Sequence, residues 1–192
     1  MNKIVRFALW GAVGFGIGGA IGGAITSGFD GGSEDFLKLI LDSGILGIFG
    51  GASLGFVSKG WKGTIFLALA GGAGFFVGNV LSFFILFPIG YALPESIIEI
   101  YEFVIPLLIG AITGAIGGIA FRLALKDWRG VGLLALAGAV GFGIAWQINE
   151  RLLVSLLTTR ILSSVVPLSI WGLIGGAFLG AALGYLNKRR VD

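Results

Sequence analysis

Apolar residues form six long runs along this chain, and each run is long enough to cross a lipid bilayer. The hydrocarbon core is about 30 Å thick, a distance that roughly 20 helical residues span. We predict membrane-spanning helices at residues 5–27, 42–59, 63–87, 103–123, 130–148 and 166–186. The sequence therefore predicts an all-α integral membrane protein whose 192 residues, 1–192, form one membrane domain.

Three connections between these runs also carry a helical pattern. They cover residues 33–42, 95–105 and 149–164, where apolar residues share one helical face and charged or hydroxyl residues lie opposite. This pattern is typical of amphipathic helices lying on a membrane surface. We therefore expect a short surface helix in each of these outer connections. Pro106 and Pro167 would then begin the fourth and sixth spans, because the first helical turn tolerates proline.

Basic and acidic residues separate between two sets of connections. The two termini and the connections near residues 59–62 and 122–129 hold ten basic residues and two acids, a net charge of +8. The other three connections hold three basic residues and eight acids, a net charge of −5. The positive-inside rule then predicts a multi-pass protein of the cell (inner) membrane with both termini in the cytoplasm. Because the basic residues lie within a few positions of span ends, they indicate contact with the bilayer rather than with nucleic acid.

Two tryptophans accompany these basic residues. Trp61 stands in Lys-Gly-Trp-Lys-Gly and Trp128 in Lys-Asp-Trp-Arg-Gly. Tryptophan beside lysine or arginine is typical of the membrane–water interface. We predict that both side chains are interface anchors.

Glycine recurs at every fourth position in the second, fourth and sixth runs. The glycines are Gly47, Gly51, Gly55, Gly110, Gly114, Gly118, Gly172, Gly176, Gly180 and Gly184. A four-residue period places them on one helical face. Glycine costs a helix in water roughly 1 kcal/mol relative to alanine, but in lipid small residues let helix backbones approach closely. We predict that these glycine ladders are helix-packing faces.

A second glycine motif, Gly-x-x-Gly-Phe, occurs in the first, third and fifth runs. Its glycines are Gly11, Gly14, Gly71, Gly74, Gly138 and Gly141. The ladders themselves are 63 and 62 residues apart. We therefore predict three tandem two-helix units, residues 1–60, 61–127 and 128–192, with parallel topology and pseudo-threefold symmetry. Residues 14–19 also fit G-x-G-x-x-G, but that motif binds nucleotides between a strand and a helix, whereas here it lies inside a span.

Candidate chemistry is sparse. The chain has no histidine and no cysteine, which excludes thiol and imidazole catalysis, disulfides and Cys/His metal sites. No charged residue falls near the centre of a predicted span, where proton relays and ion-coupled carriers need one. Asn79 and Gln147 are candidate intramembrane polar contacts, because an amide in hydrocarbon needs a partner.

Two functions fit this pattern. The favoured one is a non-enzymatic accessory or scaffold subunit of a larger membrane assembly, whose partners are the bilayer and other membrane chains or a second copy. The alternative is a passive channel or facilitator for a small solute, which predicts an axial cavity lined by Asn79 or by bare glycine backbone. No cofactor is predicted, although a glycine face has room for a lipid tail or a pigment ring.

Overall fold

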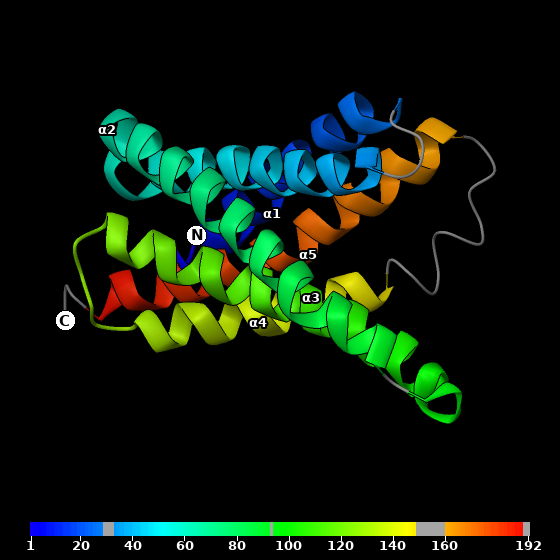
Figure 1. The fold of residues 1–192 in the computed structure, drawn as a ribbon. Coiled ribbons are helices and arrows are strands. Elements are labelled where there is room, and N and C mark those ends of the chain that lie inside the picture. Colours follow the sequence, from blue (N-terminus) through cyan, green and yellow to red (C-terminus); the bar gives the residue numbers. More distant parts are fainter. Residues whose placement is uncertain (29–32, 93, 149–159, 190–192) are drawn as a thin grey trace.

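The computed structural model describes residues 1–28, 33–92, 94–148 and 160–189, and within them every regular element is a helix (Figure 1). The helices are α1 (Lys3–Thr26), α2 (Ser33–Ala92), α3 (Glu95–Ala124), α4 (Val131–Ile148) and α5 (Arg160–Lys188). All five are long and apolar enough to cross a membrane. The prediction of a helical, multi-pass membrane protein is confirmed at this level.

Helix α2 contains both the second and the third predicted spans. Its backbone leaves helical geometry at Lys59 (φ −139°, ψ 16°) and Gly60 (φ 64°, ψ −150°). A straight helix of 60 residues would extend about 90 Å, roughly three times the bilayer core. Instead, residues 33–58 (the first arm) and 61–92 (the second arm) run side by side, since a Cβ at Gly47 would overlap the backbone of Gly71 and a Cβ at Gly55 that of Gly63.

The predicted outer surface helices are not separate elements. Residues 33–42 lie within α2 and residues 95–105 within α3, and both continue into the apolar runs without a break. Pro106 and Pro167 lie inside α3 and α5, so neither proline begins a helix, and each lies near the start of an apolar stretch long enough to cross a membrane, Phe103–Ala124 and Ile161–Lys188. Proline removes a single backbone donor, and membrane helices tolerate this because neighbouring groups supply the lost contacts. Of the third predicted surface helix, residues 149–159 lie outside the described residues, and the rest opens α5.

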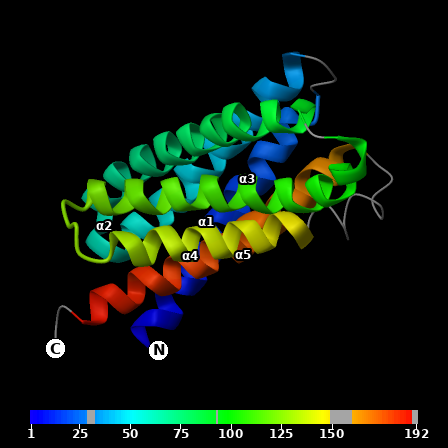
Figure 2. The same ribbon diagram turned by 60° about the horizontal axis from the view of Figure 1, so that its bottom comes forward.

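The glycine ladders lie where helices meet. The two arms of α2, the pair α3 and α4, and the pair α5 and α1 each approach so closely that a Cβ on a ladder glycine would overlap the backbone of the facing helix (Figure 2). These pairs of glycine and facing residue are Gly51 with Leu67, Gly110 with Phe142, Gly114 with Gly138, Gly118 with Leu134, Gly172 with Phe15, Gly176 with Gly11, and Gly180 with Phe7. Each of these contacts joins two of the predicted repeat units rather than the two helices of one unit.

Three phenylalanines from different helical segments meet inside the bundle. Phe15 of α1, Phe75 of the second arm of α2 and Phe142 of α4 are fully buried. Their ring centroids are 5.2 Å apart for Phe15 and Phe75, 5.5 Å for Phe15 and Phe142, and 4.8 Å for Phe75 and Phe142. Each follows the second glycine of the Gly-x-x-Gly-Phe motif. This phenylalanine triad closes the interior of the bundle with aromatic rings.

Each ring of the triad also packs on a glycine of a neighbouring helix. An added Cβ would overlap the ring of Phe15 at Gly50, that of Phe75 at Gly117 and that of Phe142 at Gly175. The predicted packing glycines Gly14, Gly74 and Gly141 lie on the same contacts, against Ser53, Ala120 and Phe178. Glycine therefore serves both to bring backbones together and to leave room for aromatic rings.

Candidate functional site at the basic end

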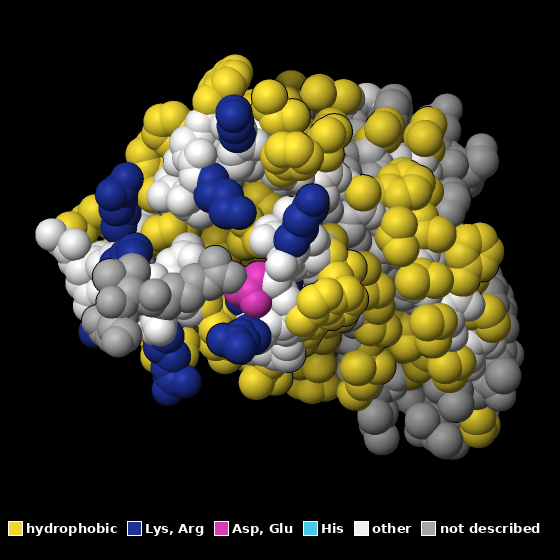
Figure 3. Space-filling model, turned by 90° about the vertical axis from the view of Figure 1, so that its left-hand side faces the viewer, with side chains coloured by type: hydrophobic (Ala, Val, Ile, Leu, Met, Phe, Trp, Pro, Cys, Tyr) yellow, Lys and Arg dark blue, Asp and Glu magenta, His cyan; other side chains and the backbone are white. Residues whose placement is uncertain are grey.

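Basic residues gather at one end of the helical bundle. Both chain ends, the bend in α2 and the α3–α4 connection lie at this end (Figure 1). Figure 3 looks onto it and shows lysine and arginine side chains distributed around the face, with little acidic surface among them. Two cavities open here, and no ring of the phenylalanine triad lines either of them.

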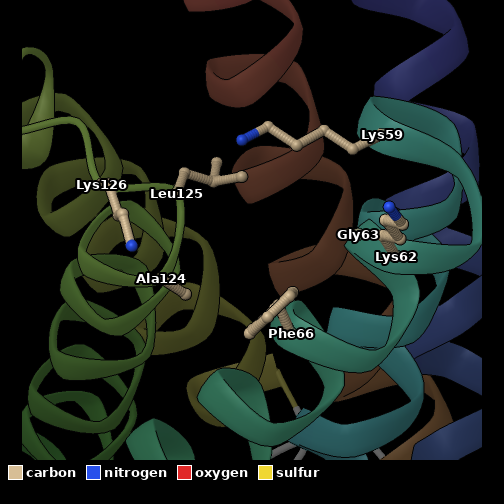
Figure 4. Close-up of a pocket in the computed structure, with 7 residues that line it drawn as sticks. All are labelled: Lys59, Lys62, Gly63, Phe66, Ala124, Leu125 and Lys126. Carbon is tan, nitrogen blue, oxygen red and sulfur yellow. The ribbon is translucent and has the colours of Figure 1, made fainter.

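The first cavity, which we call the lysine pocket, has a volume of about 270 Å³ (Figure 4). It is lined by Lys59, Lys62, Gly63, Phe66, Ala124, Leu125 and Lys126. Lys59 and Lys62 come from the bend in α2, whereas Lys126 follows the end of α3. Three ammonium groups and no carboxylate therefore border a cavity with apolar walls.

The second cavity, which we call the arginine pocket, has a volume of about 720 Å³. It is lined by Arg122, Asp127, Arg129, Gly130, Leu133, Tyr185, Leu186 and Arg189. Two of its three guanidinium groups, those of Arg122 and Arg189, contact other side chains of the protein. The Nη2 of Arg122 lies 2.5 Å from the Asp127 carboxylate and also donates to the Arg129 carbonyl, and the Arg189 guanidinium lies 4.8 Å from the centroid of the Tyr185 ring.

The backbone after α3 positions the residues of both pockets. The Lys126 N–H donates to the Leu123 carbonyl (2.9 Å), and the Asp127 N–H donates to the Arg122 carbonyl (3.3 Å). These two bonds form a Schellman cap, which requires a left-handed residue after the helix and favours glycine there. Lys126 takes this place with φ 54° and is the one residue other than glycine with positive φ in the described part of the chain.

The two predicted interface anchors lie in the same end of the molecule. Trp61 is 72% exposed and Trp128 is 76% exposed. Each belongs to the chain segment that borders one pocket. Exposed indole rings suit a membrane–water interface, and their role as anchors stays a prediction.

The two predicted amide contacts lie elsewhere, and neither lines a basic pocket. Asn79 is 1% exposed and donates to the Leu39 carbonyl at 3.0 Å, which joins the two arms of α2. Gln147 of α4 donates to the Phe103 carbonyl of α3. The structure thus places both amides as ties between helical segments, and it does not bring them together.

Two buried ionisable residues were not predicted from the sequence. Arg122 is 1% exposed and Asp42 is 5% exposed. The Thr26 hydroxyl donates to the Asp42 carboxylate at 2.6 Å. Neither residue lines a pocket of the basic end. The sequence gives only their positions as an indication of this contact: Thr26 lies next to the end of one predicted run, and Asp42 begins the next run.

No protein-family model, curated protein or solved structure matches this chain. Within the described residues, no three Asp, Glu, His or Cys side chains converge as metal ligands would. Function is therefore inferred from the geometry of the chain itself.

Proposed function

We propose that the protein is a non-enzymatic accessory or scaffold subunit of a larger assembly in the cell (inner) membrane. The observation that carries this proposal is the phenylalanine triad, in which three fully buried rings from three helical segments pack against one another inside the bundle. Ladder glycines at contacts between helices add to a solid, closely packed bundle. A closely packed bundle is suited to a structural role in which its outer surface binds other membrane chains.

The passive channel is not proposed, because nothing in the described residues favours it. It required an axial cavity lined by Asn79 or glycine backbone. Asn79 donates to the Leu39 carbonyl, so the side chain that would line such a path makes a contact between the two arms of α2.

The proposed topology has six crossings in three two-helix units, with each arm of α2 crossing once and both termini in the cytoplasm. The gathering of basic residues at the end that holds both termini and the α2 bend supports it. The chain lacks cysteine, so single-cysteine variants can test it directly. A membrane-impermeant maleimide should label Ser27→Cys in intact cells, but Lys62→Cys and Lys188→Cys only after permeabilisation. Labelling of both Ser27→Cys and Lys62→Cys in intact cells would exclude a crossing by the first arm of α2.

The proposed partner-facing flank lies on the second arm of α2. Four phenylalanines are exposed there, with exposed fractions from 43% to 65%: Phe66, Phe76, Phe84 and Phe87. Aromatic residues are enriched at protein interfaces, where they bury a large area at low cost in conformational entropy. We propose that another membrane chain, or a second copy, covers this flank.

Purification in mild detergent tests the subunit proposal, with co-purifying chains identified by mass spectrometry. A photo-crosslinking residue at Phe84 (64% exposed) should yield a discrete protein adduct. The same residue at Leu136 (61% exposed), on α4, is the matched control and should yield none. A lone monomer without a protein adduct at either position would contradict the proposal.

A further inference from the structure

Three exposed lysine side chains line the lysine pocket. Lys59 and Lys62 come from the bend in α2, and Lys126 comes from the connection that follows α3 (Figure 4). No carboxylate lines the pocket, and no ion pair involves these lysines within the described residues. Ammonium groups gathered in this way repel one another, and an anion between them would relieve the repulsion.

The backbone at Lys126 points to the same conclusion. A left-handed backbone is unfavourable for any residue with a Cβ, and glycine would fit the cap after α3 without that cost. The lysine therefore makes the cap less stable while it adds a charge to the pocket. Strained backbone that persists in a structure is often found where a side chain has a role in binding.

The arginine pocket provides an internal comparison. Lys62, Gly63 and Phe66 recur 67 residues later as Arg129, Gly130 and Leu133, which is also the distance from Phe75 to Phe142. Three lining positions of the lysine pocket thus have counterparts at the same spacing in the arginine pocket.

The two pockets differ in one respect. The arginine pocket contains its own carboxylate, that of Asp127, which pairs with Arg122 at 2.5 Å. Among the described residues no carboxylate lines the lysine pocket, so an anion bound there would meet no acidic group of the lining.

From these observations we infer that the lysine pocket binds a phosphate group. Lysines act on phosphate as compact point charges, and a phosphate group is negatively charged at neutral pH, so a pocket lined by three lysines favours it. Phe66 and Leu125 supply apolar walls, which suit the carbon atoms attached to a phosphate ester. The group belongs either to the headgroup of an anionic lipid or to a free phosphate compound. The inference goes beyond the subunit proposal and does not depend on it.

The test uses the full chain purified in mild detergent and native mass spectrometry. The probes are phosphatidylglycerol, phosphatidylcholine and inorganic pyrophosphate. We expect retention of phosphatidylglycerol or pyrophosphate and little retention of phosphatidylcholine, whose phosphate charge is balanced. Retention of the anionic lipid alone identifies a headgroup, and retention of pyrophosphate identifies a free phosphate compound. Equal retention of both lipids without pyrophosphate binding would overturn the inference.

Charge variants locate the site. Replacing Lys59, Lys62 and Lys126 with glutamine should weaken binding about fivefold per lysine, if each contributes as a basic residue near an anionic surface does. The matched control replaces Lys3, Arg6 and Lys188 with glutamine, which removes as many charges from the same end but none from the pocket. If the control weakens binding as much as the pocket variant, diffuse charge explains the binding and the inference fails.

One substitution is expected to change phosphate binding and thermal stability in opposite directions. Lys126→Gly should weaken binding while it raises the melting temperature, because glycine fits the left-handed cap. A merely structural role of Lys126 predicts no change in phosphate binding, and that result would overturn the assignment.

Discussion

Gly114→Ala tests whether the glycine ladders hold the helices together. Gly114 lies in the middle of the α3 ladder and faces Gly138 of α4. A Cβ at this position would overlap the Gly138 carbonyl oxygen, and would lie 2.6 Å from its carbonyl carbon and 2.9 Å from the Phe142 Cβ. These neighbours belong to backbone and to the base of a side chain, so they cannot rotate away. The two helices must separate to admit one methyl group.

The expected cost follows from two opposing terms. Overpacking a closely packed interior costs typically 1–3 kcal/mol, and more where backbone must move. Alanine regains about 1 kcal/mol of helix propensity relative to glycine, a value measured in water. We therefore expect Gly114→Ala to lower the free energy of unfolding by about 1–2 kcal/mol, and Gly114→Leu to lower it further.

Gly44→Ala is the matched control. Gly44 lies in the first arm of α2, and no atom lies within 4 Å of the position its Cβ would take. The same chemical change should therefore leave stability unchanged or raise it by up to about 1 kcal/mol. We therefore expect Gly114→Ala to lower the free energy of unfolding and Gly44→Ala to leave it unchanged or raise it.

The measurement is unfolding in mixed micelles of a mild detergent and SDS, followed by circular dichroism. Both variants and the parent are titrated under the same conditions. If Gly114→Ala unfolds at the parent midpoint, or if both variants shift equally in the same direction, the ladder is not a packing interface.

Three further substitutions are measured in the same titration. Phe142→Ala removes a fully buried ring of the triad and should cost about 3–5 kcal/mol; a loss below 1 kcal/mol would show that the triad is not part of the core. Thr26→Val keeps the shape but leaves the Asp42 carboxyl without its hydroxyl donor, so we expect a loss of about 1–3 kcal/mol, against almost none for Ser27→Ala at an exposed position. Gln147→Leu removes the tie to the Phe103 carbonyl and should cost less than about 1 kcal/mol, as single hydrogen bonds between membrane helices do; a larger loss would give this tie a greater role than we assign.

The helical membrane architecture could be predicted because it depends on properties that are local in the sequence. Apolar runs of sufficient length dictate helices, since the bilayer offers no water to unpaired backbone groups. The connection expected near residues 59–62 coincides with the break in α2 at Lys59 and Gly60. A change from apolar to Lys-Gly-Trp-Lys is visible without any tertiary information.

The ends of the helices could not be predicted in the same way. Residues 95–105 carry an amphipathic pattern, and Pro106 follows them, yet α3 runs through from Glu95 to Ala124. Periodicity describes which face is apolar, but it does not say whether a helix stops or continues. Proline inside a membrane helix removes one hydrogen bond, which is too small a cost to end a helix of 30 residues.

The candidate site was beyond prediction because its residues are distant in sequence. The charge count placed Lys59, Lys62 and Lys126 on one side of the membrane, but not around one cavity. Their meeting depends on how α3 packs against the second arm of α2. Likewise, the Thr26–Asp42 bond needs the end of α1 to lie beside the first arm of α2, which no local pattern encodes.

Among the described residues, the three with positive φ lie at the basic end, and one of them is not a glycine. Gly60 (φ 64°) and Gly130 (φ 79°) follow the rule that left-handed positions take glycine. Lys126 (φ 54°) departs from it, in a chain with 36 glycines. Packing does not explain this choice, because glycine would satisfy the cap equally well and at lower energy. The ammonium group explains it, since it is what glycine would remove from the lysine pocket.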